Sequence, residues 1–303
     1  MLARHSLKLP DIELSYLEWN SQTGTEKIPR LLLLHGLADS AVVWTSLGNY
    51  LSNRYHIVAP DMRGHGESGK PETGYTFARA IADLEALMAH LNWQNAHIVG
   101  HSWTGKLTLI WARQNGDRIS SMILVDPIFI TKLPAVMKLS LPIVYRKLDC
   151  LKCMGPFATL AQAEAAAKQS GEYAGWSEVQ QMIFQNQIEQ KSDGSWGSKF
   201  VIPARNQIFA EVMEVAGLTE NIDIPTLFVQ PEKGVNRMDW QMQPYKTYLQ
   251  NLTIVKVPGN HWCFLTQPET FNQTVAEFLY HFSKSCNTLL PPLAPPCKGG
   301  EQE

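Results

Sequence analysis

The sequence lacks the apolar stretches that would place it in a membrane or direct it across one. No run of apolar residues approaches the roughly 20 that a membrane-spanning helix needs. The first ten residues include Arg4, His5 and Lys8 but no apolar segment of the kind found in a signal peptide. We therefore expect no membrane span and a cytoplasmic location.

The chain also has no large excess of positive or negative charge, and it has few cysteines. The 303 residues include 26 lysines and arginines and 28 aspartates and glutamates, a balance that argues against nucleic acid as a partner. The 5 cysteines are irregularly spaced, which argues against a disulfide framework and suits a reducing compartment. Cys150 and Cys153 form a C-x-x-C pair, but no second pair or histidine pair has zinc-binding spacing. We expect structural thiols here, and no metal or cofactor.

Over most of the chain, short apolar runs alternate with amphipathic helical patterns. Strands buried on both faces are predicted at residues 30–35, 55–59, 96–100, 121–125, 226–230 and 253–257. Two further strands are predicted at 6–9 and 12–18, on either side of a turn at Pro10-Asp11. Helices are predicted at 41–51, 77–91, 103–114, 239–249 and 269–282. The alternation predicts an α/β fold with a mostly parallel sheet.

The alternation stops between Pro127 and about Gly217. This stretch has helical patterns at 159–168, 177–190 and 204–215 and no convincing strand. We therefore expect an inserted α-helical lid at 128–217, and a core built from residues 1–127 and 218–284. The proline-rich composition of residues 285–303 predicts a disordered tail.

Residues 98–105, Ile-Val-Gly-His-Ser-Trp-Thr-Gly, carry the strongest chemical signal. A predicted strand ends just before Ser102 and a helix begins just after it, so the hydroxyl lies at a sharp turn beside a helix N-terminus. A nucleophilic serine also needs a histidine base, a carboxylate that orients the histidine, and backbone N–H groups that bind the oxyanion.

The candidate base is His261, which follows the last predicted strand and therefore lies on a loop at the carboxyl edge of the sheet. The alternative is a histidine that only caps the following helix. Oxyanion donors are expected after residues 30–35, where Gly36 lets the backbone turn. These donors would be the N–H groups of Leu37 and of Trp103, the residue after the serine.

Together these motifs resemble the α/β-hydrolase superfamily. The matching stretches, in family order over about residues 7–284, are His35-Gly36, Asp61-Met-Arg-Gly-His-Gly-Glu-Ser68, Gly100-His-Ser-Trp-Thr-Gly105, Leu124-Val-Asp-Pro127 and Gly259-Asn-His261. The resemblance implies an eight-stranded sheet with helices on both faces and a triad in the order serine, acid, histidine. Within the second stretch, Asp61 and Arg63 are expected to pair.

One departure from the family pattern lies beside the serine. Thr104 stands where the second glycine of G-x-S-x-G is usual, and that glycine allows the helix to pack closely on the strand. Either Gly105 provides the room, or the helix lies slightly further away.

The second departure concerns the acid. Gly234 stands where the resemblance places the triad aspartate, and a glycine cannot orient a histidine. Three carboxylates could replace it: Asp126 at the end of the strand 121–125, Glu232, or Asp239. Haloalkane dehalogenases of one subgroup resemble the first arrangement. We favour Asp126, because a carboxylate at a strand end is rigidly held; its alternative role is to cap the turn at Pro127.

These residues favour a serine hydrolase that cleaves a small or medium ester or related acyl compound. A carbon–carbon bond hydrolase or lyase could use the same triad, and the missing acid at Gly234 leaves open a non-catalytic receptor for a small molecule. Ser102 argues against epoxide hydrolase and dehalogenase chemistry, for which this family uses a carboxylate nucleophile. The sequence makes no prediction of the oligomeric state.

The insertion contains five aromatic residues of interest: Trp176, Phe184, Trp196, Phe200 and Phe209. Some of them could line an apolar pocket, while others pack the insertion onto the core.

Overall fold

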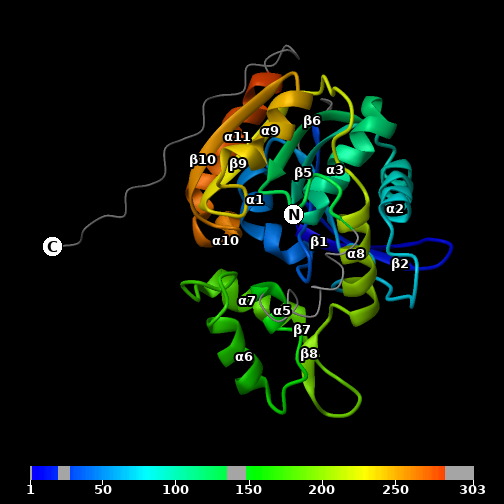
Figure 1. Ribbon diagram of the computed structural model, residues 1–303. Coiled ribbons are helices and arrows are strands. Elements are labelled where there is room, and N and C mark those ends of the chain that lie inside the picture. Colours follow the sequence, from blue (N-terminus) through cyan, green and yellow to red (C-terminus); the bar gives the residue numbers. More distant parts are fainter. Residues whose placement is uncertain (1, 20–27, 135–147, 284–303) are drawn as a thin grey trace.

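The computed structural model describes residues 2–19, 28–134 and 148–283, so the tail predicted at 285–303 lies outside it. Eight strands form one sheet in the order β1-β2-β4-β3-β5-β6-β9-β10 (Figure 1). In it, β2 runs antiparallel to both of its neighbours and the other pairs are parallel. The predicted eight-stranded, mostly parallel sheet is therefore confirmed. The strands are β1 (Leu2–Lys8), β2 (Glu13–Trp19), β3 (Arg30–Leu34), β4 (His56–Pro60), β5 (Ala96–His101), β6 (Ile119–Val125), β9 (Thr226–Lys233) and β10 (Leu252–Asn260).

Helices connect the strands and cover both faces of the sheet (Figure 1). The helical segments within the sheet-bearing part are η1 (Ala41–Trp44), α1 (Thr45–Leu51), α2 (Phe77–His90), α3 (Trp103–Gln114), η2 (Gly116–Arg118), α9 (Asp239–Tyr248), α10 (Cys263–Thr266) and α11 (Pro268–Ser283).

Strand β3 shows why the central strands need continuous apolar runs. Leu32 and Leu34 belong to a hydrophobic layer that includes residues of α2, α3 and α9. Leu31 and Leu33 point to the opposite face and belong to a layer with α1, α10 and α11. All four side chains are fully buried, and each contributes about 1.5–3 kcal/mol relative to an exposed leucine.

Between β6 and β9 the chain leaves the sheet. In Figure 1 the green segments of this insertion, including α6, α7 and β8, lie below the sheet, and α8 runs along its side. The insertion contains α5 (Asp149–Lys152), α6 (Leu160–Lys168), α7 (Glu178–Gln187), β7 (Ile188–Gln190), β8 (Trp196–Ser198) and α8 (Ile202–Glu214).

The prediction that the insertion contains no strand was wrong, because β7 and β8 pair as an antiparallel hairpin. The two strands have 3 residues each, too few to show the alternating pattern of a strand. Residues 188–190, predicted as the end of a helix, belong to the first of them. The Asp193-Gly194 dipeptide is a known hairpin signal, and Gly194 has a φ of 83° at the turn.

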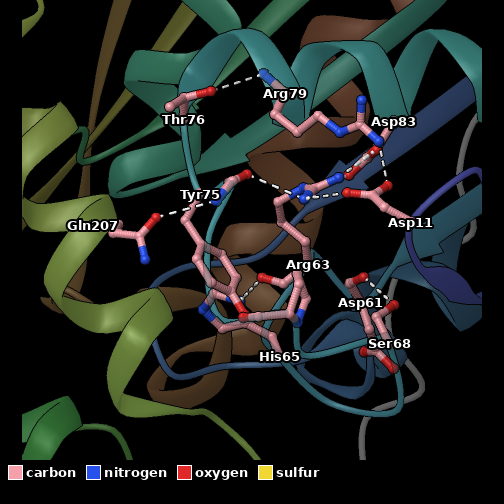
Figure 2. A network of polar contacts seen from close by, with 12 residues as sticks. Asp11, Asp61, Arg63, His65, Ser68, Tyr75, Thr76, Arg79, Asp83 and Gln207 are labelled. Carbon is pink, nitrogen blue, oxygen red and sulfur yellow. Dashed lines mark hydrogen bonds and ion pairs between the residues drawn. The ribbon is translucent and has the colours of Figure 1, made fainter.

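The loop from Asp61 to Ser68 is held by charges (Figure 2). The expected pairing of Asp61 with Arg63 was wrong: the buried Arg63 guanidinium donates two hydrogen bonds to Asp83 of α2, at 2.7 and 2.8 Å. Asp61 instead accepts hydrogen bonds from Arg4 and from the Ala41 backbone, both at 2.7 Å. The loop therefore ties β1, η1 and α2 together.

None of the helices in the described ranges combines the length and the hydropathy that a bilayer crossing requires. The same ranges contain no group of three or more histidine, cysteine, aspartate or glutamate residues that could hold a metal ion. The structure does not describe the side chain of Cys150 or the two cysteines of the tail, Cys286 and Cys297.

Candidate active site

Ser102 lies at the turn between β5 and α3, as the sequence predicts. Its backbone has a φ of 59° and a ψ of −119°, a conformation that costs a residue other than glycine about 1–3 kcal/mol. The hydrogen bond from the Ser102 N–H to the Val125 carbonyl, at 3.0 Å, fixes the turn against β6. Such strain at a turn between two rigid elements is typical of a functional residue.

Close packing of α3 on β5 explains the glycines around Ser102. A Cβ at Gly100 would lie 2.7 Å from the Thr104 carbonyl oxygen, and one at Gly105 would lie 2.9 Å from the Pro127 Cβ. Gly105 therefore lets α3 pack closely against Pro127 and the Gly100 carbonyl. Thr104 is fully buried, and its hydroxyl lies 2.9 Å from the Leu34 carbonyl and 2.8 Å from the His101 carbonyl. The threonine thus binds two strand ends together.

The two predicted oxyanion donors have no competing acceptor. Within the described residues, no hydrogen bond is made by the backbone N–H of Leu37 or of Trp103, and Trp103, as the first residue of α3, has no acceptor inside the helix. Gly36 is needed for a different reason from the one predicted. Its φ lies outside the left-handed region, which Ala38 adopts at 64° instead. A Cβ at Gly36 would lie 2.5 Å from the His101 ring.

His261 and Asp126 come together although 135 positions separate them. His261 Nδ1 lies 2.7 Å from Asp126 Oδ2, which leaves Nε2 for the serine. Ser102 and His261 line one pocket. The described atoms show no hydrogen bond between these two side chains, a contact that in unliganded enzymes is often long and shortens on substrate binding.

Of the three candidate acids, the structure brings Asp126 to His261. Glu232 and Asp239 are exposed, and neither is bonded to His261 in the described structure. Gly234 has a clear steric role, because a Cβ there would lie 2.5 Å from Asp126 Oδ2 and 2.9 Å from its Cγ. The carboxylate at 126 thus occupies space that any side chain at 234 would need.

The β9–α9 loop holds the Asp126 carboxylate, a feature that sequence reasoning missed. The Val235 and Asn236 N–H groups donate to it at 2.8 and 3.1 Å, and the Asn236 side-chain amide donates at 2.8 Å. Burial raises the pKa of Asp126, but the hydrogen bonds from His261 and from this loop more than offset it and hold that pKa below its ordinary value. The carboxylate is therefore charged at neutral pH and can stabilise an imidazolium at His261.

Sequence reasoning also missed a second group of buried polar residues, which includes Asp39 in the loop after β3. His101 Nε2 lies 3.0 Å from the His261 carbonyl. Its Nδ1 lies 3.6 Å from Asp39 Oδ2, and the Asp39 carboxyl contacts Glu172 of the insertion. Both acids are buried, and within the described residues neither the Asp39 oxygens nor Glu172 Oε1 has a hydrogen-bond partner. Burial, followed by the Asp39 charge, raises the pKa of Glu172 well above its ordinary value.

A pocket of about 350 Å³ opens beside Ser102. Among the aromatic residues predicted for it, Phe209 of α8 lines the pocket. The others pack instead: Trp176 and Phe184 contact Tyr173, Phe200 stacks on His65, and Trp196 packs against an apolar cluster that includes residues of α6 and α7. Besides Ser102, His101 and His261, the lining residues are Leu37, Ile128, Phe129, Leu148, Phe209, Val235, Asn236, Gln241 and Trp262.

Comparison with known proteins agrees with this architecture. The family model of the α/β hydrolase fold matches residues 29–148. The chain is 33% identical over 98 residues to a soluble epoxide hydrolase of Corynebacterium sp. (strain C12), and 35% identical over 98 residues to 2-(acetamidomethylene)succinate hydrolase of Mesorhizobium japonicum. Each match covers 32% of this chain and about a third of the relative, 34% and 35% respectively.

Structural similarity extends much further than sequence similarity. The crystal structure of E-2-(acetamidomethylene)succinate hydrolase superimposes with a TM-score of 0.77 at 21% identity, over 92% of this chain and all of the other. At this level of identity the likeness establishes the fold, whereas the site chemistry has to be argued from the residues of this chain. The sheet order, the serine turn and these matches together show that the chain has the α/β-hydrolase fold.

Proposed function

We propose that the protein is a serine hydrolase that cleaves small or medium esters through an acyl-enzyme. One observation carries the proposal: the strained Ser102 shares a pocket with His261, whose other ring nitrogen lies 2.7 Å from the buried Asp126 carboxylate. In this proposal Ser102 is the nucleophile, His261 the base and Asp126 the acid. The Leu37 and Trp103 amides bind the oxyanion.

In the first half-reaction, Ser102 Oγ attacks the carbonyl carbon of the ester while His261 Nε2 takes the hydroxyl proton. The carbonyl π electrons move to the oxygen, and the negative charge is stabilised by the Leu37 and Trp103 N–H groups. The tetrahedral intermediate collapses, the bond to the leaving oxygen breaks, and His261 gives that oxygen its proton. An alcohol leaves, and an ester on Ser102 remains.

The second half-reaction replaces the alcohol by water. His261 takes a proton from water as its oxygen attacks the acyl carbon, and the same two amides bind the second oxyanion. Collapse breaks the bond to Ser102 Oγ, which recovers its proton from His261, and a carboxylic acid leaves. Throughout, Asp126 keeps the His261 ring in one tautomer and stabilises its charged form.

The nucleophile separates this chain from relatives named for epoxide or dehalogenase activity. A carboxylate that opens an epoxide or displaces a halide forms an ester, which water can hydrolyse. A serine hydroxyl in the same reaction forms an ether, which water does not cleave. Ser102 therefore supports acyl chemistry rather than the activity in the name of the Corynebacterium relative.

A non-catalytic receptor of the same fold is less well supported. Gly234 cannot serve as a triad acid, but the Asp126 carboxylate lies 2.7 Å from His261 Nδ1 and can take that role. We also propose that residues 128–217 act as a lid, since Phe129, Leu148 and Phe209 of this stretch line the pocket.

Turnover of p-nitrophenyl butanoate tests the proposal. We expect a burst of about one p-nitrophenol per protein molecule followed by slower steady release, because p-nitrophenolate is a good leaving group and acylation should therefore be faster than deacylation. Ser102→Ala should abolish both phases, while thermal unfolding checks that the variant is folded. Steady hydrolysis that survives in Ser102→Ala would contradict the assignment of the nucleophile.

A further inference from the structure

The backbone around His261 is held on both sides by polar side chains. His101 Nε2 donates a hydrogen bond to the His261 carbonyl at 3.0 Å. Asn260 Oδ1 accepts a hydrogen bond from the Trp262 N–H at 2.9 Å, which closes a turn around His261. Because the direction of a ring depends on the backbone that carries it, these two contacts help to set where His261 Nε2 points.

The same Asn260 amide also reaches the insertion. Its Nδ2 donates to the Gly171 carbonyl at 2.7 Å, across 89 positions of the sequence. The two partners fix the orientation of the amide, since the Gly171 carbonyl needs a donor and the Trp262 N–H needs an acceptor. One side chain thus joins the turn at His261 to the turn that follows Gly171.

The next residue of the insertion approaches the other contact of His261. Glu172 is buried and interacts with the Asp39 carboxyl. Asp39 Oδ2 in turn lies 3.6 Å from Nδ1 of His101, the residue that holds the His261 carbonyl. Two consecutive residues of the insertion, Gly171 and Glu172, therefore lie close to the groups that hold the two sides of the histidine turn.

This turn of the insertion is itself firmly held. Gln180 of α7 is buried, and its Nε2 donates to the carbonyls of Glu172 and Ala174 at 3.0 and 3.1 Å. Tyr173 is also buried, and its hydroxyl donates to Gln187 Oε1 at the end of the same helix, at 2.7 Å. These contacts let the turn act as a fixed point for the loop that carries the catalytic histidine.

We propose that Asn260 is a positioning residue for the catalytic base, and that the insertion fixes His261 through the Gly171 carbonyl. This inference rests on the proposed function, in which His261 acts in both half-reactions. Loss of the contact should therefore slow acylation and deacylation alike, so that kcat falls while KM stays nearly the same. A contact that only stabilised the fold would leave both constants of the folded protein unchanged.

Asn260→Asp tests the contact with little change of shape. The aspartate keeps an oxygen for the Trp262 N–H but places a second oxygen, without a hydrogen, opposite the Gly171 carbonyl. We expect kcat for p-nitrophenyl butanoate to fall about 10- to 100-fold, with KM changed less than about threefold. Thermal unfolding checks that the variant is folded.

Asn260→Ser is the neutral companion of this variant. Its hydroxyl can still accept from the Trp262 N–H but is too short to reach Gly171, so we expect a similar loss of kcat. Unchanged kcat in both folded variants would overturn the inference. A loss in Asn260→Asp alone would come from the added charge, and would overturn it as well.

Asn186→Asp is the matched control. Asn186 is exposed on α7, and its Nδ2 donates to the Met182 carbonyl at 2.8 Å. The substitution therefore also replaces an amide that donates to a backbone carbonyl, but away from the histidine turn. It should leave kcat and KM unchanged, and a fall equal to that of Asn260→Asp would contradict the proposal.

A variant of the insertion tests the same contact from its other side. Gln180→Met removes the two hydrogen bonds that hold the turn after Gly171 and leaves Asn260 unaltered. We expect kcat to fall, and the double variant with Asn260→Asp to lose less than the product of the two single losses, because both act through one contact. Losses that multiply would show that the turn does not act through Asn260.

The outcomes distinguish this inference from the proposed function. If the wild type neither cleaves the ester nor reacts with a fluorophosphonate at Ser102, the proposed function fails. If the wild type cleaves the ester and the folded Asn260 variants keep its kcat, the hydrolase stands and the positioning inference fails.

Discussion

Replacing Gly234 by alanine should sharply lower the proposed esterase activity without unfolding the protein. The new Cβ would lie 2.5 Å from Asp126 Oδ2, about 0.9 Å closer than the 3.4 Å at which ordinary contact begins. Since Gly234 adopts a φ that other residues tolerate, the strain falls on the contact with Asp126. The carboxylate must then move away from its position 2.7 Å from His261 Nδ1.

A displacement of this size has a calculable effect. Misplacing a catalytic group by about 1 Å costs about 100-fold in rate, which corresponds to about 2.7 kcal/mol of transition-state stabilisation. Overpacking at one buried site lowers the free energy of unfolding by about 1–3 kcal/mol. We therefore expect kcat/KM for p-nitrophenyl butanoate to fall about 100-fold in Gly234→Ala, while most of the folded stability remains.

The assay combines ester kinetics with thermal unfolding. Gly116→Ala is the matched control, because a Cβ at Gly116 would meet only Ile224 Cδ1, at an ordinary 3.6 Å. This control should keep full activity. Wild-type kinetics in Gly234→Ala would refute the reasoning, since they would mean that the Asp126 carboxylate is not needed in its present position.

Three further predictions concern charged residues, and each is tested by substitution. Asp126→Asn should lower kcat about 10³- to 10⁴-fold, because the amide cannot hold the His261 tautomer, while Glu232→Gln should leave kcat unchanged; equal losses in both would contradict the choice of acid. Glu172→Gln should remove a pH dependence of the folded stability. Burial and the adjacent Asp39 raise the pKa of Glu172. The stability that the protonated Glu172 contributes to the wild type is therefore complete below the ordinary glutamate pKa and is lost as pH rises through the raised pKa. The Tm of the variant should fall less than that of wild type from pH 5 to 8, and parallel profiles would refute this. Burial lowers the pKa of Lys106 to about 7, so wild type should gain stability between pH 7 and 10 relative to Lys106→Met; an equal change in both Tm values would argue against this pKa.

Features set by neighbouring residues were predictable from the sequence. The leucine run of β3 predicts a strand buried on both faces whatever its partners are, and all four leucines after Arg30 are indeed buried. The serine turn is predicted in the same way, since a strand, a serine and a helix follow one another directly between Ala96 and Gln114.

Features that depend on distant partners were less accessible. Arg63 binds Asp83 of α2 rather than its near neighbour Asp61, because the fold places that helix against the loop. The amides of Val235 and Asn236 that hold Asp126 come from a loop more than 100 positions away, with separations of 109 and 110. The spacing of residues along the sequence does not indicate such long-range contacts.

Reaction of the protein with a fluorophosphonate, followed by peptide mapping by mass spectrometry, tests the central claim most directly. We expect one phosphonyl adduct per molecule, located on Ser102, and its loss in Ser102→Ala. Labelling should be slower in Asp126→Asn, because the His261 base would lose its orientation. A folded wild-type protein that forms no adduct, or forms it at another residue, would show that Ser102 is not the nucleophile.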